Sequence, residues 1–269
     1  MATYNANTET LLTNNQTLHE TKVGVDRHGN VLEGGGGFEF LLNVARGRHS
    51  DITFEHKTGY IQSNFSNGDT VWEHGSAYPW TSLATAQTLY LDSSTNNAND
   101  RGLPIIIVGL DSSYNIQTEE IILDANNSTT SVATTKQFLR INNVYVNNGV
   151  TNEGNITVRV TNGSGTLVEI IPAGFGRSMS GIYTVPAGYT GYLIKGSAST
   201  TTASVIGFYV RYFSEGFKLQ HVAPADNTQY VYDFPIPLPF PEKTDMDVRG
   251  IIGSGRCAVN WDMILYKNN

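Results

Sequence analysis

The sequence predicts an all-β protein, an antiparallel β-sandwich that is jelly-roll-like, with an extended N-terminal arm. Three observations favour this class. Glycine is frequent (27 of 269 residues) and Asn, Thr and Ser recur throughout, as tight turns between short strands require. Apolar residues alternate with polar ones, as at Ile156, Val158 and Val160, which is typical of strands with one buried face. Strands do not alternate with helical patterns, which disfavours Rossmann and barrel-enzyme architectures.

Residues 1–37 predict a flexible arm rather than packed domain. They are polar and end in the stretch EGGGG, whose glycines make a flexible joint. Valines alternate before a turn at residues 28–30, and two apolar residues follow it, so a hairpin and an arm that becomes ordered on a neighbour both stay open. We expect the apolar residues of the arm to contact a partner: Leu11, Leu12, Val23, Val25, Val31 and Leu32.

The rest of the chain divides into N-terminal strands with a connector (38–80) and a sandwich body (81–269). Most of the apolar runs are bounded by Gly, Asn, Pro or Asp, and short strands at this spacing indicate a sandwich or barrel. The expected strands are 38–44, 51–56, 69–74, 87–93, 103–110, 115–123, 137–146, 154–161, 166–171, 203–214, 217–222, 229–234, 245–252 and 256–266.

Two Pro-Ala-Gly turns predict hairpins. The clearer one joins the two halves of GIYTVPAGYTGYLIKG (181–196), and a sister turn lies in LVEIIPAGFGRS (167–178). Proline fixes φ on entry and glycine supplies positive φ on exit, so we interpret both as scaffold turns rather than ligand loops.

A proline-rich strap is expected at 234–241. Proline alternates there with apolar residues, and proline cannot donate to a ladder, so the stretch predicts an extended, polyproline-like connector. Its apolar residues either pack over the core or contact another subunit: Ile236, Leu238 and Phe240.

The sequence offers no catalytic, metal or cofactor constellation. No two histidines stand at ligand spacing, and no G-x-S-x-G elbow or P-loop is present. TDMD (244–247) puts two aspartates on one face of a strand. They could bind a divalent ion, or they could mark the start of a strand with their carboxylates hydrogen-bonded to protein groups, and the sequence leaves both alternatives open. The single cysteine, Cys257, lies in an apolar run and predicts a small buried hydrophobe. We therefore expect that the protein is not an enzyme.

Charge and hydropathy limit the partners. The net charge is −7 and no basic stripe appears, which argues against nucleic-acid binding. No apolar run is long enough to span a membrane, and the N-terminus does not have the pattern of a secretory signal. Aromatic residues keep an alternative open, in which Trp80 and Tyr189 stack on a glycan.

Six stretches together resemble a family of virion structural proteins of tailed bacteriophages, many of them from cyanobacterial phages. They occur in the family's order, and the resemblance covers roughly residues 70–266: TVWEHGSAYPW (70–80), IVGLDSSYNIQTEEIIL (107–123), FLRINNVYV (138–146), NEGNITVRV (152–160), SMSGIYTVPAGYTGYL (178–193) and PEKTDMDVRG (241–250).

The resemblance implies a virion component without catalytic residues, made in the host cytoplasm. A capsid decoration (cement) protein on the head surface is the leading interpretation, with the major capsid protein and copies of itself, as a trimer, as partners. A tail or adaptor component, or a glycan-binding host-recognition protein, is the alternative.

Overall fold

The computed structural model describes residues 24–25, 31–32, 42–147 and 149–268, and the chain forms two compact units, Met1–Phe54 and Glu55–Asn269. In the first unit, β1 (Gly24–Val25) pairs antiparallel with β2 (Val31–Leu32), as the hairpin interpretation predicts. Residues 42–45 are helical, not part of the expected strand 38–44, whose first four residues lie outside the described part.

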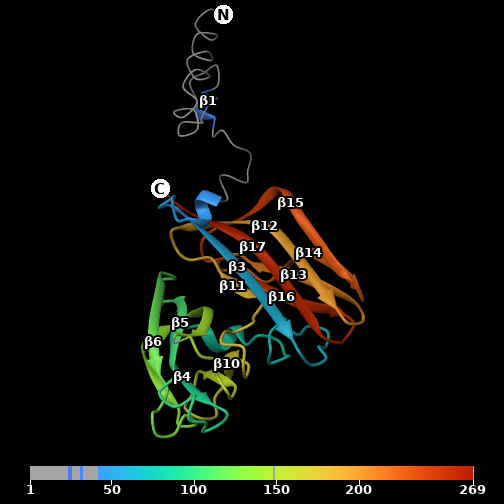
Figure 1. Ribbon diagram of the computed structural model, residues 1–269. Helices are drawn as coiled ribbons and strands as arrows, with labels where there is room; N and C mark the ends of the chain where they lie inside the picture. Colours follow the sequence, from blue (N-terminus) through green and yellow to red (C-terminus); the bar gives the residue numbers. More distant parts are fainter. Residues whose placement is uncertain (1–23, 26–30, 33–41, 148, 269) are drawn as a thin grey trace, which may run out of the picture. The chain divides into compact units, whose positions relative to one another are not determined.

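An eight-stranded jelly roll lies in the second unit, apart from the first three residues of its first strand (Figure 1). One sheet has the order β15-β12-β17-β3: Gln229–Phe240, Tyr189–Thr200, Cys257–Lys267 and Ile52–Ile61. The other has the order β11-β16-β13-β14: Ile182–Thr184, Asp245–Ile252, Ala203–Arg211 and Lys218–Asp226. Numbered along the chain, the sheets read 6-3-8-1 and 2-7-4-5, which is the double Greek key of a jelly roll. The predicted all-β, jelly-roll-like class is confirmed.

A second sandwich is inserted between the first and second strands of the jelly roll. Its sheets have the orders β10-β9-β4-β7 and β6-β5-β8, and a short 3-10 helix, η1 (Trp80–Leu83), precedes them. The strands are β4 (Gln87–Ser93), β5 (Pro104–Leu110), β6 (Ile116–Ile122), β7 (Val132–Phe138), β8 (Arg140–Val146), β9 (Ile156–Arg159) and β10 (Leu167–Ile171). The single sandwich body expected at 81–269 is therefore two sandwiches.

Each sandwich has its own apolar core. In the inserted sandwich, Leu89, Ile105 and Val158 are fully buried between the two sheets. In the jelly roll, Val210, Met246 and Met263 have the same role. Alternation along β17 shows the cause, because every second residue from Cys257 to Leu265 is buried.

The Pro-rich stretch is an edge strand, not a connector. Residues 234–240 form the second half of β15, which pairs with β12 through Leu193 opposite Leu238 and Lys195 opposite Asp233. Between these pairs, residues 234–237 face only Ile194, so the strand bulges. Proline is tolerated because β15 is at the edge of its sheet, where the unpaired side of the strand needs no N–H donor.

The predicted hairpin at 181–196 is not formed. β11 pairs with β16, whereas β12 pairs with β15 and β17, so the turn at Pro186 to Gly188 carries the chain from one sheet to the other. The sister turn at Pro172 to Gly174 follows β10, which pairs back to β9, and it also makes no hairpin. Both glycines have positive φ, as the turn prediction requires.

Candidate functional site

A hollow lies where the inserted sandwich meets the jelly roll. This pocket, called here the seam pocket, has a volume of about 290 Å³. Its walls come from η1, the loop after β5, the start of β8, the turn after β13 and the start of β16. Its lining residues are Trp80, Thr81, Ala84, Tyr114, Arg140, Arg211, Tyr212, Phe213, Ser214, Glu215, Lys243 and Asp245.

A buried carboxylate organises the cations of the seam pocket. Asp245 Oδ1 accepts hydrogen bonds from Arg140 Nε at 2.8 Å and Thr184 Oγ1 at 2.6 Å. Its Oδ2 accepts from Arg211 Nη2 at 2.6 Å and Nε at 2.9 Å. Burial acts to lower the pKa of Arg140, but the hydrogen bonds and charge of Asp245 outweigh it and raise that pKa. Two guanidinium groups around one carboxylate leave a net positive charge.

A second carboxylate fixes the tryptophan behind this cluster. Asp247 Oδ2 accepts from Trp80 Nε1 at 2.8 Å and from Arg249 Nε at 2.9 Å, while Oδ1 accepts from Thr70 Oγ1 at 2.9 Å. Burial raises the pKa of Asp247, and Arg249 and these hydrogen bonds oppose that rise. Because both aspartates of the TDMD motif bond to protein groups, the motif is a satisfied strand entry.

Aromatic rings and one lysine form the rim. The rings of Tyr114 and Phe213 meet edge to face at 5.9 Å, and Lys243 Nζ lies 5.8 Å and 5.2 Å from their centroids. The rim segments are held in place from below, because Ala187 N donates to Tyr114 O and Lys243 N donates to Val185 O, each at 2.8 Å. The Pro-Ala-Gly turn thus helps to hold the rim of the seam pocket through a backbone hydrogen bond.

The backbone of the rim is strained. Tyr114 (φ 68°), Ser214 (φ 64°) and Lys243 (φ 64°) are three of the four described non-glycine residues with positive φ. Such conformations cost about 1–3 kcal/mol each and gather at ligand-binding segments. The three strained residues all line the same pocket, which marks it as a candidate binding site.

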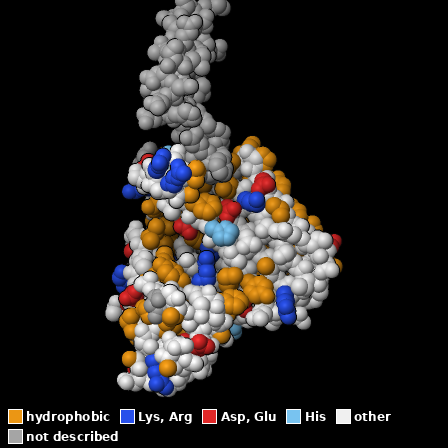
Figure 2. Space-filling view, in the orientation of Figure 1, with side chains coloured by type: hydrophobic (Ala, Val, Ile, Leu, Met, Phe, Trp, Pro, Cys, Tyr) orange, Lys and Arg blue, Asp and Glu red, His pale blue; other side chains and the backbone are white. Residues whose placement is uncertain are grey.

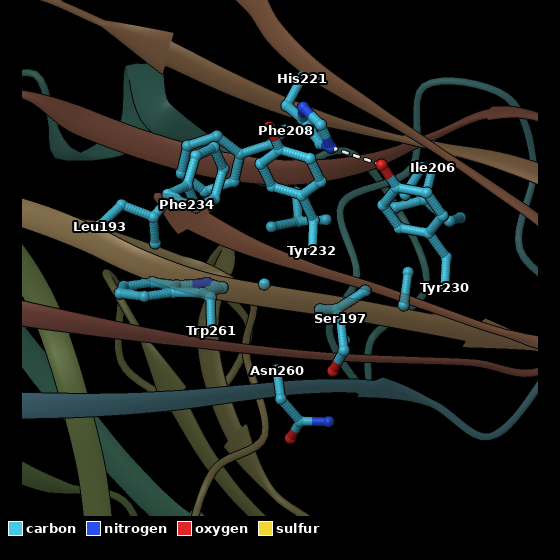
Figure 3. A pocket seen from close by; sticks show the side chains of 15 residues that line it. Leu193, Ser197, Ile206, Phe208, His221, Tyr230, Tyr232, Phe234, Asn260 and Trp261 are labelled. Atoms are coloured by element: carbon cyan, nitrogen blue, oxygen red, sulfur yellow. Dashed lines mark hydrogen bonds between the residues drawn. The ribbon is translucent and has the colours of Figure 1, made fainter. Parts of the chain in front are cut away.

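A second, apolar cavity is lined by residues from both sheets of the jelly roll (Figure 3). It measures about 50 Å³ and lies between the sheets, beside the edge strands β14 and β15. His221 Nε2 and Tyr230 Oη are 3.1 Å apart above it, and burial lowers the pKa of His221. Trp261 lies below, and its buried Nε1 has no hydrogen-bond partner among the described residues.

A buried lysine and glutamate lie between the two sandwiches. Lys57 Nζ donates to Asn142 O at 2.6 Å, and burial lowers the pKa of Lys57 to about 8. Glu169 accepts from Ser180 Oγ at 2.9 Å, and burial raises its pKa to about 7, against the charge of Lys57. Neither group lines the seam pocket, and both bond to protein groups, so we interpret them as structural.

The described residues contain no group of three metal-ligating side chains. No helix in the described ranges is long and apolar enough to cross a membrane. Chemically, the seam pocket offers fixed cations and ring surfaces, which suit binding of an anion.

The predicted contact residues fall into separate places. Leu11, Leu12 and Val23 lie outside the described residues, and Val25, Val31 and Leu32 are in β1 and β2. On β15, Ile236 is 82% exposed, Leu238 is half-buried against the jelly-roll core, and Phe240 is buried.

The two predicted glycan residues are not brought together in one pocket. Trp80 is only 7% exposed and lies against the guanidinium of Arg211, with its centroid 5.1 Å from Cζ. Tyr189 is half-buried against the jelly-roll core at the start of β12 and does not line the seam pocket.

Sequence reasoning missed Arg140, Arg211 and Lys243. They are 32 to 103 residues apart along the chain and meet only through the fold. TDMD was the one local signal, since its first aspartate, Asp245, is the group that gathers both arginines.

Comparisons with known proteins do not assign the chain to a family. No family model matches the chain, and no curated protein matches it. Among solved structures, the chain aligns with structures of infectious bursal disease virus. The Gx strain structure gives 13% identity over 81% of this chain and 76% of that chain, with a TM-score of 0.17. The T=1 particles derived from that virus give 9% identity over 81% and 74%, with a TM-score of 0.19. At such TM-scores the alignments carry no argument about this chain.

Proposed function

We propose that the chain is a structural component of a bacteriophage virion, and that within it the chain is a capsid decoration (cement) protein on the head surface. The sequence resemblance over residues 70–266 motivates the proposal. A jelly roll occurs in viral capsid proteins but also in lectins, so the fold is compatible with the proposal and does not by itself select it.

The observation that carries the proposal is the apolar open edge of the jelly roll. β14 and β15 are the edge strands of the two sheets, and His221 of β14 lies 4.9 Å from the ring of Tyr232 in β15. Large apolar side chains project from this edge: Leu219, Val222, Val231, Tyr232 and Ile236. An exposed set of this kind indicates a protein contact surface.

One face of the surface carries a mixture of hydrophobic, polar and charged side chains. On the face in Figure 2, hydrophobic groups are separated by polar and charged side chains. The inserted sandwich adds two further sheets to the jelly roll. The partners in this proposal are the major capsid protein and two further copies of the chain. Residues 1–37 supply an arm that lies on a neighbouring subunit and adds avidity.

Location and copy number in the particle test the proposal directly. Quantitative mass spectrometry and electron cryo-microscopy of virions that carry this protein should give hundreds of copies spread over the head. Copies confined to one vertex or to the tail would replace the decoration assignment with an adaptor or tail role.

Binding to expanded capsids tests the contact surfaces. Deletion of residues 1–33 should leave a folded domain that no longer binds. Ile236→Asp should weaken binding, while Ile122→Asp, at a side chain 50% exposed on the inserted sandwich, should not. Full binding by the truncated chain and by Ile236→Asp would refute both contact assignments. Light scattering should give three times the mass of one chain.

A further inference from the structure

We propose that the seam pocket binds an acidic saccharide, with the sugar carboxylate on Lys243 and Arg211 and the sugar ring on Phe213. The inference goes beyond the virion role and does not rest on it. The charge of the pocket, its free donors, the exposure of one ring and its size all support this ligand class.

The first step is the charge of the pocket. Arg140, Arg211 and Lys243 line it, and Asp245 offsets one of the three positive charges. The other lining carboxylate, Glu215, already pairs with Lys218 at 2.5 Å. An anion is therefore attracted into the pocket, and a cation is repelled.

The second step is which donors remain free. Arg140 uses Nε, Nη1 and Nη2 in bonds to Asp245 and to the carbonyls of Leu83 and Leu139. Arg211 bonds Asp245 through Nε and Nη2, and no hydrogen bond in the described structure uses its Nη1. No described residue accepts a hydrogen bond from the Lys243 amine, which touches only the rings of Tyr114 and Phe213. Nη1 of Arg211 and Nζ of Lys243 can therefore donate hydrogen bonds to a ligand.

The third step is the ring surface. Phe213 is 56% exposed although its ring lies beside Tyr114 and Lys243. The rings of Phe213 and Tyr114 are perpendicular, with an interplanar angle of 89°, so the two ring planes form a corner. The apolar face of a pyranose packs on such a ring, and inorganic phosphate has no surface to do so.

The fourth step is size and rigidity. A hollow of about 290 Å³ lies at the lower end of ligand pockets and suits one or two sugar rings. Positive φ at Tyr114, Ser214 and Lys243 presents these side chains at the rim. Asp245 fixes Arg211 with two hydrogen bonds, so little conformational freedom is lost from this side chain when an anion binds.

Calorimetric titration of the full chain tests the proposal. The probes are short oligomers of galacturonate, glucuronate and mannuronate, with maltotriose as a neutral saccharide and inorganic phosphate as a plain anion. At least one uronate oligomer should bind ten-fold or more tightly than both controls. Its affinity should fall as salt rises, because the contact includes a charge pair.

Three variants locate the site. Lys243→Met keeps an unbranched side chain of similar length and removes the charge, and Phe213→Ala removes the stacking ring; each should weaken uronate binding at least ten-fold. Lys195→Met makes the same charge change on β12, away from the pocket, where the side chain is 49% exposed, and should leave binding unchanged. Unaltered melting temperatures would show that all three fold.

Four results would overturn the proposal: no binding by any uronate, equal binding of maltotriose, equal binding of phosphate, or undiminished binding by Lys243→Met. Equal phosphate binding would leave a simple anion site, and a neutral preference would leave a different saccharide site. Each of these outcomes is independent of whether the chain lies on the virion head.

Discussion

Arg140 and Asp245 are 105 residues apart in the chain, and Arg140 Nε donates to Asp245 Oδ1 at 2.8 Å with both side chains buried. The first belongs to β8 of the inserted sandwich and the second to β16 of the jelly roll. The ion pair therefore joins the two sandwiches, and Arg211 ties the turn after β13 to the same carboxylate.

Asp245→Asn should destabilise the protein strongly, because it leaves the buried charge of Arg140 without a counter-ion. The expected loss of unfolding free energy is about 3–5 kcal/mol, measured by urea denaturation. Asp233→Asn removes an equal charge from a side chain that is 75% exposed and pairs with Lys195 at 3.5 Å. It should cost less than about 1 kcal/mol. Similar losses in both variants would contradict the central role of Asp245.

Gly59→Ala should disturb the contact between β3 and the segment before β11. A Cβ on Gly59 would lie 2.6 Å from both Gly181 N and Val71 O, which are backbone atoms and have no rotamer to change. We expect a loss of about 1–3 kcal/mol in thermal or urea unfolding. Gly196→Ala is the control, because nothing lies within 4 Å of its Cβ. Equal stability of the two variants would show that β3 shifts freely.

Gly188→Val should destabilise the turn that links the two sheets of the jelly roll. Gly188 has φ +75° with open space around its Cβ, so the cost comes from backbone conformation and not from a clash. A left-handed conformation costs an L-residue about 1–2 kcal/mol, and more for a β-branched one. Gly188→Asn should lose less, since Asn tolerates this region. Differential scanning calorimetry of the pair checks the order.

Glu169 should make stability fall as pH rises from about 5 to 7. Its pKa is about 7 in the folded state against an ordinary 4.5, so the folded state holds the proton longer. The contribution of Glu169 to the free energy of unfolding is fully present below its pKa in the unfolded state. It is lost as pH rises through its pKa in the folded state, by at most about 3 kcal/mol. Lys57 acts oppositely from about pH 8 upward, since its pKa is lowered to about 8. A stability minimum near pH 7–8 is the expected result.

The measurement is urea denaturation from pH 4.5 to 9 for the natural chain and Glu169→Gln. Glutamine keeps an acceptor for Ser180 Oγ and removes the titration, so the decline between pH 5 and 7 should shrink. Asp226→Asn, at an exposed residue, should leave the curve unchanged. An identical decline in Glu169→Gln would assign the effect to another group.

Cys257 should be inert to thiol reagents in the folded protein. Its side chain is buried, and burial raises the pKa of the thiol to about 12, so little thiolate forms at pH 8. Labelling should go to completion in urea. Ser112→Cys places a second thiol at an exposed position and should label at once. Fast labelling of the natural chain would show that β17 opens readily.

Local pattern was enough for most strands of the body. Runs such as 87–93, 103–110 and 245–252 match β4, β5 and β16 to within a residue, because turn residues bound apolar runs of strand length. The stretch 69–74 fails: its Thr70 and Trp72 make only isolated bridges, to Arg249 and Ser180.

Pairing between strands could not be predicted, since it depends on partners far along the chain. The Pro-Ala-Gly turn shows this: β11 and β12 are strands as expected, but each finds its partners in a different sheet. The seam pocket was hidden for the same reason. Its arginines look like ordinary strand residues until Asp245 brings them together.

The position of β17 beside β3 also determines when the jelly roll can be completed during synthesis. His56 Nδ1 and Asp262 Oδ1, 206 residues apart, are 2.5 Å from each other across these strands. The strands of the inserted sandwich pair only among themselves and are all made earlier, so that body can fold while the ribosome is still translating. β3 must wait without its neighbour until the last strand leaves the exit tunnel. A truncated or stalled nascent chain therefore exposes β3, the earliest strand of the jelly roll, to the chaperones that bind unpaired strands.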